Sequence, residues 1–263
     1  MTIQRRLHSV ALMAAPLLTA LAATAALVLP TAADAFTIDI STGLGGTRVV
    51  GSGKVVEERR PAAAFQRLRL DSAITVHARP ASAPGITVRA DDNIAPLILT
   101  AVEGDTLVIK VKPNTSIRTD SVLQVQVDFT ALTQADLRGS GDLNISAIKA
   151  DQFELSLAGS GDVRFDKAEF GRLSTRLAGS GDIWMKGRAE DASFNLAGSG
   201  DIHAAELVAR RVNVDIAGSG DVRVHAGEAL AVQIAGSGDV VYSGAPTKLT
   251  SRVVGSGDIR AAR

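Results

Sequence analysis

The sequence predicts an all-β fold, a single-chain parallel β-helix (β-solenoid). The tetrapeptide Gly-Ser-Gly-Asp occurs seven times and starts at residues 139, 159, 179, 198, 218, 236 and 255. Successive copies are 18 to 20 residues apart, a period typical of solenoids. A unit this short cannot enclose a core of its own, so each unit has to bury its apolar face against the next one. We expect about seven regular coils over residues 137–263, after a less regular, β-rich half over residues 61–136.

Apolar residues recur at fixed positions of the repeat. The residue after the motif Asp is always aliphatic, and the third residue after it is apolar, while the residue between them varies. This alternation indicates a strand with one buried face. A further aliphatic column lies two residues before each motif: Leu137, Leu157, Leu177, Leu196, Ile216, Ile234 and Val253. We therefore expect two short strands per repeat, joined at the Gly-Ser-Gly-Asp corner and separated by a looser corner such as residues 168–171.

The glycines and the Asp of the motif favour a structural interpretation. Glycines at a fixed phase indicate positive φ, which a corner requires and which residues with a Cβ resist. The Asp carboxylate is expected to accept hydrogen bonds from amides of its own turn. Alternatively, the column of carboxylates binds a cation such as calcium, although the known calcium-binding repeat has nine residues and a further Gly. We predict no metal site and no cofactor. The residues that calcium would use are Asp142, Asp162, Asp182, Asp201, Asp221, Asp239 and Asp258.

The first 35 residues have the features of an export signal. Arg5 and Arg6 precede an uncharged stretch rich in Ala and Leu at residues 10–29, and residues 33–35, Ala-Asp-Ala, match the small-x-small cleavage pattern. Cleavage there releases a chain that starts at Phe36, with no stable membrane insertion afterwards. The alternative is an uncleaved membrane anchor. We predict removal and a location in the periplasm, outside the cell or at the cell surface.

The composition agrees with an exported β protein and limits the class of partner. Without the first 35 residues, the chain has 26 basic and 27 acidic side chains, so no strong field attracts nucleic acid or anionic lipid. Aromatic residues make up only 3% of the sequence, whereas glycan and single-strand binding surfaces usually present stacking platforms. Trp184 is a single outward contact at most. The sequence contains no Cys, and therefore neither a disulfide nor a lipid-attachment Cys.

Residues 36–136 lack the repeat but contain strand patterns. Apolar runs or alternations bounded by turn residues lie at residues 65–70, 74–79, 86–89, 106–111 and 122–127. We interpret residues 61–136 as wider coils that lead into the regular stack and cover its first edge. Residues 93–101 are the only helix candidate in this half, and Pro96 weakens it. Residues 36–60 are expected to be a partly flexible or loosely docked lead.

Four features together carry a resemblance to a known family. They are residues 68–76 (Leu-Arg-Leu-Asp-Ser-Ala-Ile-Thr-Val), residues 90–94 (Ala-Asp-Asp-Asn-Ile), residues 102–107 (Val-Glu-Gly-Asp-Thr-Leu) and the series of Gly-Ser-Gly-Asp corners. In this order they resemble the bacterial GIN domain, family DUF2807, which is labelled a head domain of autotransporter adhesins. The resemblance covers about residues 60–263 and implies a β-helical fold in an exported protein. It implies no catalytic or ligand-binding residue, and the adhesin label is an analogy of fold.

Two functions of different classes fit this sequence. The first, which we favour, is a non-enzymatic exported β-helical protein with a role in adhesion or in cell-envelope structure, whose partner is an envelope or surface glycan or protein. The second is a polysaccharide lyase or hydrolase with its site on the outward face that carries His203 and His225, near Arg223 and Glu228. These columns otherwise hold ordinary surface residues, so we predict no catalytic residue. We also expect copies of the chain to associate through the edge of the last coil.

Two short motifs do not point to chemistry. The nucleophile motif Gly-x-Ser-x-Gly is absent from the sequence, because Gly-Ser-Gly places the Ser one residue too early. Residues 51–54, Gly-Ser-Gly-Lys, resemble a phosphate-binding loop but lack its first Gly and the Ser or Thr after the Lys. We interpret this segment as an echo of the repeat corner.

Overall fold

The computed structural model describes residues 46–262, which are mostly β-strand. Seventeen strands form one hydrogen-bonded sheet that winds into coils, and β1 (Thr47–Val50) pairs in parallel with β8 (Thr115–Arg118) in a separate sheet. The predicted β-solenoid is thus confirmed. The expected signal peptide, residues 1–35, and residues 36–45 of the expected lead lie outside the described residues. No helix in the described part of the chain is long and apolar enough to cross a membrane.

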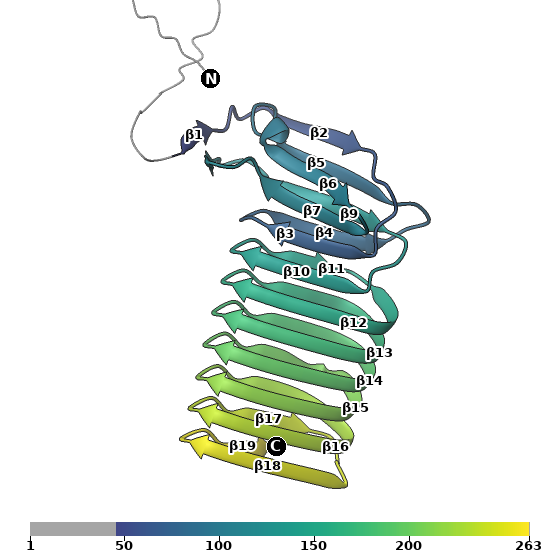
Figure 1. Cartoon of the computed structure of the whole chain (residues 1–263), viewed down its shortest axis with the longest axis vertical. Coiled ribbons are helices and arrows are strands. Elements are labelled where there is room, and N and C mark those ends of the chain that lie inside the picture. The colour runs from purple at the N-terminus through teal and green to yellow at the C-terminus, as the bar shows by residue number, and fades with distance from the viewer. Residues whose placement is uncertain (1–45, 263) are drawn as a thin grey trace, which may run out of the picture. The chain divides into compact units, whose positions relative to one another are not determined.

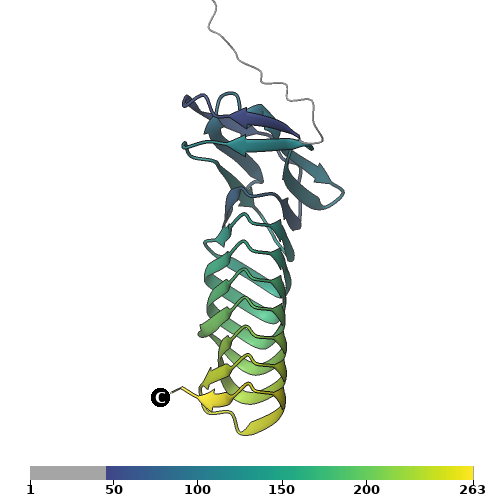
Figure 2. The same ribbon diagram turned by 90° about the vertical axis from the view of Figure 1, so that its left-hand side faces the viewer.

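The regular coils stack through parallel strands in register (Figure 1). Like residues pair with like: Leu157 pairs with Leu177, and Leu177 pairs with Leu196. Seven corners delimit six full turns, and Figure 2 shows these turns stacked along one axis. The strands are β10 (Gln134–Gly139), β11 (Leu143–Ile145), β12 (Ile148–Gly159), β13 (Val163–Gly179), β14 (Ile183–Gly198), β15 (Ile202–Gly218), β16 (Val222–Gly236), β17 (Val240–Ser243), β18 (Lys248–Gly255) and β19 (Ile259–Ala261).

The strands of the central coils are longer than expected. The expectation of two short strands per repeat is wrong for β13, β14, β15 and β16, which each run from one Gly-Ser-Gly-Asp corner to the next and continue through the predicted looser corner. The chain bends without leaving the ladder because the neighbouring coils bend at the same place. Register shifts, such as the one between Phe165 and Ala168, absorb the bend. In the first and last coils the strand is interrupted at this corner, between β11 and β12 and between β17 and β18.

The two glycines of the corner are required for different reasons. The first Gly has a positive φ in all seven copies, for example +143° at Gly179, which confirms the expectation for this position. The second Gly does not lie in the left-handed region. A Cβ at Gly181 would instead overlap the backbone carbonyl of Gly161 in the preceding coil. Neighbouring corners therefore lie too close together for a side chain at either position.

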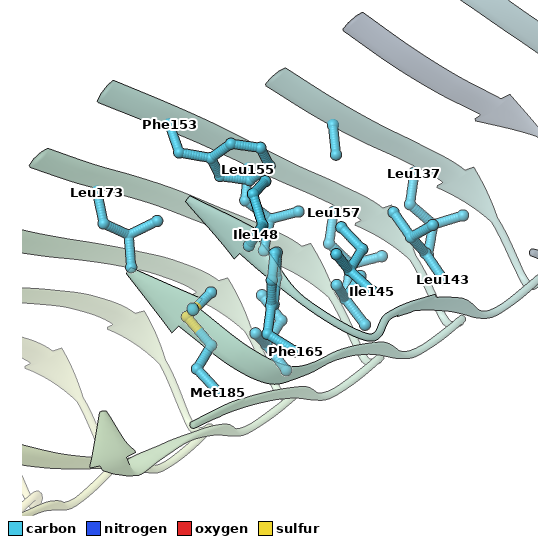
Figure 3. Packing of buried hydrophobic residues seen from close by; sticks show 14 of the residues in the cluster. Leu137, Leu143, Ile145, Ile148, Phe153, Leu155, Leu157, Phe165, Leu173 and Met185 are labelled. Atoms are coloured by element: carbon cyan, nitrogen blue, oxygen red, sulfur yellow. The ribbon is translucent and has the colours of Figure 1, made fainter. Parts of the chain in front are cut away.

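The inward columns form one continuous hydrophobic core. Figure 3 shows side chains from β10, β11, β12 and β13, such as Leu137, Leu157 and Phe165, pointing into the space between the two faces of the coils. The largest side chains cluster at β12 and β13. Phe153 and Phe170 stack with their ring centroids 5.1 Å apart, and Phe165 meets them edge-on at 5.7 and 6.1 Å. Aromatic rings thus fill this part of the interior.

The N-terminal half continues both faces of the solenoid. β3 (Arg67–Asp71) pairs in parallel with β10, and β4 (Thr75–Pro80) pairs in parallel with β11. β7 (Thr106–Val111) and β9 (Gln124–Phe129) add a further strand to each face, again in parallel. These four strands lie within one or two residues of the predicted strand segments. They form the transition from the regular coils to the remaining strands of the N-terminal half.

Residues 61–136 are not wider coils throughout, as was expected. β6 (Ile98–Glu103) pairs with β7 in the antiparallel direction, and β5 (Gly85–Asp91) does so with β9 and with β2 (Val55–Arg60). Of these pairs, only β6 and β7 are joined by a short connection, which antiparallel pairing allows and a parallel crossover does not. The helix candidate reduces to a single 3-10 turn, η1 (Ala95–Leu97), followed at once by β6.

Within the lead expected at residues 36–60, two strands form, β1 and β2. The half-buried Arg60 anchors β2, because its guanidinium donates a hydrogen bond to the carbonyl of Ala95 at 2.9 Å. Residues 51–54 connect β1 to β2 and do not stack as a repeat corner. Instead, the backbone N–H of Ser52 donates to Asn93 Oδ1 at 3.0 Å, and the Ser52 hydroxyl donates to Asp92 Oδ1 at 2.6 Å.

Candidate functional site

The motif aspartates form a column of hydrogen bonds that runs between the coils. In six successive pairs, Oδ1 of one Asp accepts a hydrogen bond from the backbone N–H of the motif Asp in the next coil, at 2.8 to 3.3 Å. The carboxylates therefore bond to the next coil and not within their own turn, contrary to the expectation. The close stacking of the glycine corners brings this amide nearest to the carboxylate. The column links the corners along the length of the stack.

The column lacks the convergence of a metal centre. From Asp142 to Asp239, one oxygen of each motif Asp is already engaged by a backbone N–H. Calcium takes about six to eight oxygen ligands around one point. Among residues 46–262, no three His, Asp or Glu side chains converge so as to hold a metal ion. That the column binds no calcium stays a prediction.

A ladder of four side chains, Arg, Trp, His and Arg, lies on the strand segments that follow the corners. The Cζ of Arg164 lies 4.1 Å from the centroid of the Trp184 ring, and this ring stacks on that of His203 with centroids 5.1 Å apart and an interplanar angle of 17°. His203 Nδ1 lies 3.1 Å from Nη1 of Arg223 in the following coil. Because neighbouring coils cover both faces of the indole, Trp184 offers a sugar ring only its edge.

The alternative enzyme site at His203 and His225 does not assemble. The structure brings His203 together with Arg223, whereas His225 Nδ1 lies 3.0 Å from the hydroxyl of Ser243. No hydrogen bond joins the two histidines in the described part of the chain. Glu228, the predicted neighbour, instead pairs with Arg210 at 2.8 Å. The face thus lacks an arrangement in which one group would act as acid and another as base on one bond.

The opposite face of the solenoid carries two parallel grooves. They lie on the strand segments that precede the corners and cross β13, β14, β15, β16 and β18. At the usual strand spacing, five strands span about 19 Å. Their volumes are about 450 and 600 Å³. Each groove is therefore long and shallow, a shape that suits an extended chain better than a compact molecule.

The first groove runs between a partly charged column and a column of small polar residues. Its walls are the outward columns Arg172, Asp191, Arg211, Ala229 and Lys248, and Ser174, Ser193, Asn213, Ala231 and Thr250. The second groove lies one step nearer the corners and has one apolar wall. Its walls are the columns Arg176, Asn195, Asp215, Gln233 and Arg252, and Ala178, Ala197, Ala217, Ala235 and Val254.

The ridge between the grooves presents oriented amides and hydroxyls. Asn213 Nδ2 donates to Asp215 Oδ2 at 2.7 Å, and Asn195 Nδ2 donates to the Ser193 hydroxyl at 3.5 Å. These donors and acceptors repeat at the spacing of the strands, while the exposed alanines leave room beside them. The face can therefore hydrogen-bond an extended ligand whose polar groups also repeat. These columns are not recognisable in the sequence, because each contains only common surface residues.

Ion pairs between coils line the edge at which the chain bends. Arg211 Nη2 donates to Asp191 Oδ2 at 2.8 Å, and Arg188 Nη2 donates to Glu169 Oε2 at 2.9 Å. The hydrogen bond and charge of Arg211 lower the pKa of Asp191, and those of Arg188 lower the pKa of Glu169. An arginine of the next coil thus holds each of these two carboxylates in its ionised form.

Acid is expected to weaken the stack through these pairs. A carboxyl group whose pKa is lowered on folding stabilises the fold above its unfolded pKa, and this contribution is lost as the pH falls through the folded pKa. The free energy of unfolding should therefore decrease as the pH falls from about 5 to 3. Denaturant unfolding at several pH values measures it. Arg211→Gln should flatten this dependence, and an unchanged slope would contradict the assigned role of Asp191.

The comparisons with known proteins agree with this architecture. The family described as "putative auto-transporter adhesin, head GIN domain" (DUF2807) matches residues 64–246. The chain belongs to this family. The GIN domain thus includes the transition strands and most of the repeat coils. Among curated proteins, none matches the chain.

Solved structures show the same fold. A "putative adhesin" from Bacteroides fragilis is 22% identical, with a TM-score of 0.77, and the match covers 81% of this chain and 100% of that chain. A "putative lipid binding protein" from Parabacteroides distasonis is 27% identical, with a TM-score of 0.71 and coverage of 82% and 100%. A "putative adhesin" from Parabacteroides merdae is 22% identical, with a TM-score of 0.67 and coverage of 82% and 99%. The GIN fold thus occurs in proteins with an adhesin label and in one with a lipid-binding label.

Proposed function

We propose that this GIN-domain protein is a non-catalytic, exported adhesin-like protein whose grooved face binds an extended envelope or surface glycan. The observation that carries the proposal is the pair of parallel grooves across five strands, with small polar side chains repeated along them. A glycan chain presents hydroxyl groups at regular intervals, and these match repeated amide and hydroxyl partners. Membership of an adhesin-labelled family and the export signal expected at residues 1–35 support the same role.

A binding assay with a blocked groove tests this proposal. Purified protein is applied to an array of glycans and envelope polymers, and each polymer that binds is then checked for release of products. Ala217 lines the second groove, so Ala217→Glu should fill it and lower polymer affinity about tenfold or more, which corresponds to ~1.4 kcal/mol. Ala205, which is exposed but lines neither groove, gives the matched control Ala205→Glu.

Three outcomes decide between the functions. Binding that is lost in Ala217→Glu and kept in Ala205→Glu supports adhesion through the grooved face. Release of products from any polymer would contradict a non-catalytic role, and loss of this release in His203→Ala would revive the enzyme alternative. Equal binding by both variants and the unchanged protein would show that the grooves are not the site.

We also propose that copies of the chain associate through β18. All eight residues of this strand are exposed, and the exposed fractions of Leu249 and Val253 are 47% and 40%. These two residues continue the inward columns in which Leu230 and Ile234 are buried. A second copy that pairs along β18 would cover both the apolar side chains and the free backbone groups of the strand edge.

Light scattering over a range of protein concentrations tests this association. Val253→Lys should shift the protein toward the monomer, because it places a charge on the apolar end of the inward column. Thr250→Lys is the control, since Thr250 belongs to an outward column on the same strand. A monomer at high concentration, with no change in either variant, would rule out the association.

A further inference from the structure

A third hollow lies on the outward face of the N-terminal strands, away from the residues of the two grooves. It has a volume of about 650 Å³ and involves β2, β5, β9 and β4. We call it the arginine hollow, because four of its lining residues are Arg59, Arg60, Arg79 and Arg89. Only two acidic residues, Glu57 and Asp128, line it. Its formal charge is therefore +2, although that of the whole chain is zero.

The register of the strands explains how the hollow forms. Thr87 on β5 lies between Arg59 on β2 and Gln126 on β9. Two residues before Thr87, Gly85 lies opposite Asp128 on β9, and it contributes no side chain. The centre of this sheet surface is therefore low, and the longer side chains of the neighbouring positions surround it. The hydroxyl of Thr87 and the amide of Gln126 are neutral donors in the floor.

The four guanidinium groups differ in their partners. Arg60 is already used by the fold, since it donates to the carbonyl of Ala95 at 2.9 Å and to Glu58 Oε2 at 2.8 Å. Arg79 is fixed by Asp128, because its Nε donates to Oδ1 at 2.6 Å, and this hydrogen bond raises the pKa of Arg79. Both groups help to shape the hollow but bring little free charge to it.

Arg59 and Arg89 supply the surplus charge. Arg59 has only a weak contact with Glu57, at 4.0 Å, and its side chain is 86% exposed. For Arg89, residues 46–262 offer no carboxylate within 4.0 Å and no side-chain hydrogen bond, although Glu57 is its partner in the strand register. Two guanidinium groups thus border one hollow and share a single nearby carboxylate, that of Glu57. Arginine binds phosphate with two parallel hydrogen bonds, which gives both affinity and orientation.

We propose that the arginine hollow binds a phosphate ester. Two guanidinium groups that share one carboxylate leave a positive charge and several N–H donors for an anion with several oxygens, as a phosphate ester has. Arg89 and Arg59 bind the phosphate oxygens, Arg79 adds a positioned donor, and Thr87 and Gln126 bind the attached organic part. The volume lies in the range of pockets for small organic ligands, about 300–1,000 Å³, and so has room for more than the phosphate itself. This site is independent of the grooved face.

Titration of the full chain, purified after export, tests the site. The probes are glycerol 3-phosphate, with glycerol as the uncharged control, and vesicles of phosphatidylglycerol, with phosphatidylcholine vesicles as the control surface. We expect a phosphate-bearing probe to bind and the double variant Arg59→Gln/Arg89→Gln to weaken its binding at least about tenfold. Arg138→Gln, at an exposed arginine of β10 that lies outside the hollow, should leave the binding unchanged.

The arms of the experiment separate the two sources of the phosphate. Binding of glycerol 3-phosphate in solution supports a soluble phosphate ester as the ligand, and binding of phosphatidylglycerol vesicles alone supports a lipid headgroup. Circular dichroism shows whether the double variant is folded, which we expect because both arginines are exposed. The proposal is overturned if no phosphate probe binds, or if the folded double variant binds as well as the unchanged protein.

Discussion

Gly179→Ala is expected to destabilise the solenoid by about 2–6 kcal/mol, the combined cost of backbone strain and steric overlap. The φ of Gly179 is +143°, a conformation that a residue with a Cβ strongly disfavours. The new Cβ would also overlap the backbone carbonyl of Gly159 in the preceding coil. The backbone cannot move aside, because hydrogen bonds tie the corner to both neighbouring coils. Urea unfolding measures the loss.

Two further glycines separate strain from overlap. Gly181→Ala should cost about 1–3 kcal/mol or more from overlap with Gly161 alone, because Gly181 has no positive φ. Gly227 is the matched control, since the nearest atom to its Cβ position is the carbonyl oxygen of Ala209 at an ordinary 3.6 Å. Gly227→Ala should change the free energy of unfolding by less than about 1 kcal/mol, in either direction, because the Ala also restricts the unfolded chain. Equal losses in all three variants would refute the argument from stacking.

The repeat made the coiled half of this fold predictable from sequence. A single strand of alternating apolar residues is a weak signal, but here the same columns occur seven times at one phase. Parallel, in-register stacking follows directly, because it pairs each aliphatic residue with its equivalent in the next coil. The pairing of Leu157 with Leu177 confirms this reasoning. The positive φ of the first Gly is a further consequence of the same phase.

The N-terminal half was predicted less well because alternation does not encode strand direction. A half-buried strand has a period of two residues whether its neighbour is parallel or antiparallel. The strands at residues 106–111 and 122–127 were therefore placed closely, and so was β5 through its predicted segment 86–89, but its antiparallel direction was not predicted. β6 was missed because its first residues fall in the helix candidate at residues 93–101. β2 was missed because only Val56 and Arg60 of its six residues are even half-buried, so no apolar face marks it.

The candidate site shows a different limit of sequence reasoning. The sequence suggested the two histidines because His can act as acid and base. In the structure, however, His203 contacts Arg223 and His225 contacts Ser243. The grooved face consists mostly of Ser, Asn, Arg and Ala, and a single residue of these types does not indicate a binding site in a sequence. Only the register brings these residues into columns at equal spacing. The arginine hollow likewise depends on antiparallel pairing, which places Arg59 near Arg89 across β2 and β5.

Phe165→Ala is expected to cost about 3–5 kcal/mol, because it removes a buried ring that no nearby group can replace. The exposed fraction of Phe165 is 1%, and its ring meets those of both Phe153 and Phe170 edge-on. Its column neighbour in the next coil, Met185, is equally buried. Phe165→Leu keeps part of the volume and should lose less than half as much. Thermal and urea unfolding of both variants check the order.

The position of the loss along the stack carries more information than its size. Coils contact only their neighbours, so the energy removed at Phe165 belongs to the interfaces of β13 with β12 and β14. Hydrogen exchange should therefore speed up first in these three strands, while the amides of β16 keep their protection. Equal acceleration throughout residues 134–261 would contradict this, because the stack would then open only as a single cooperative unit.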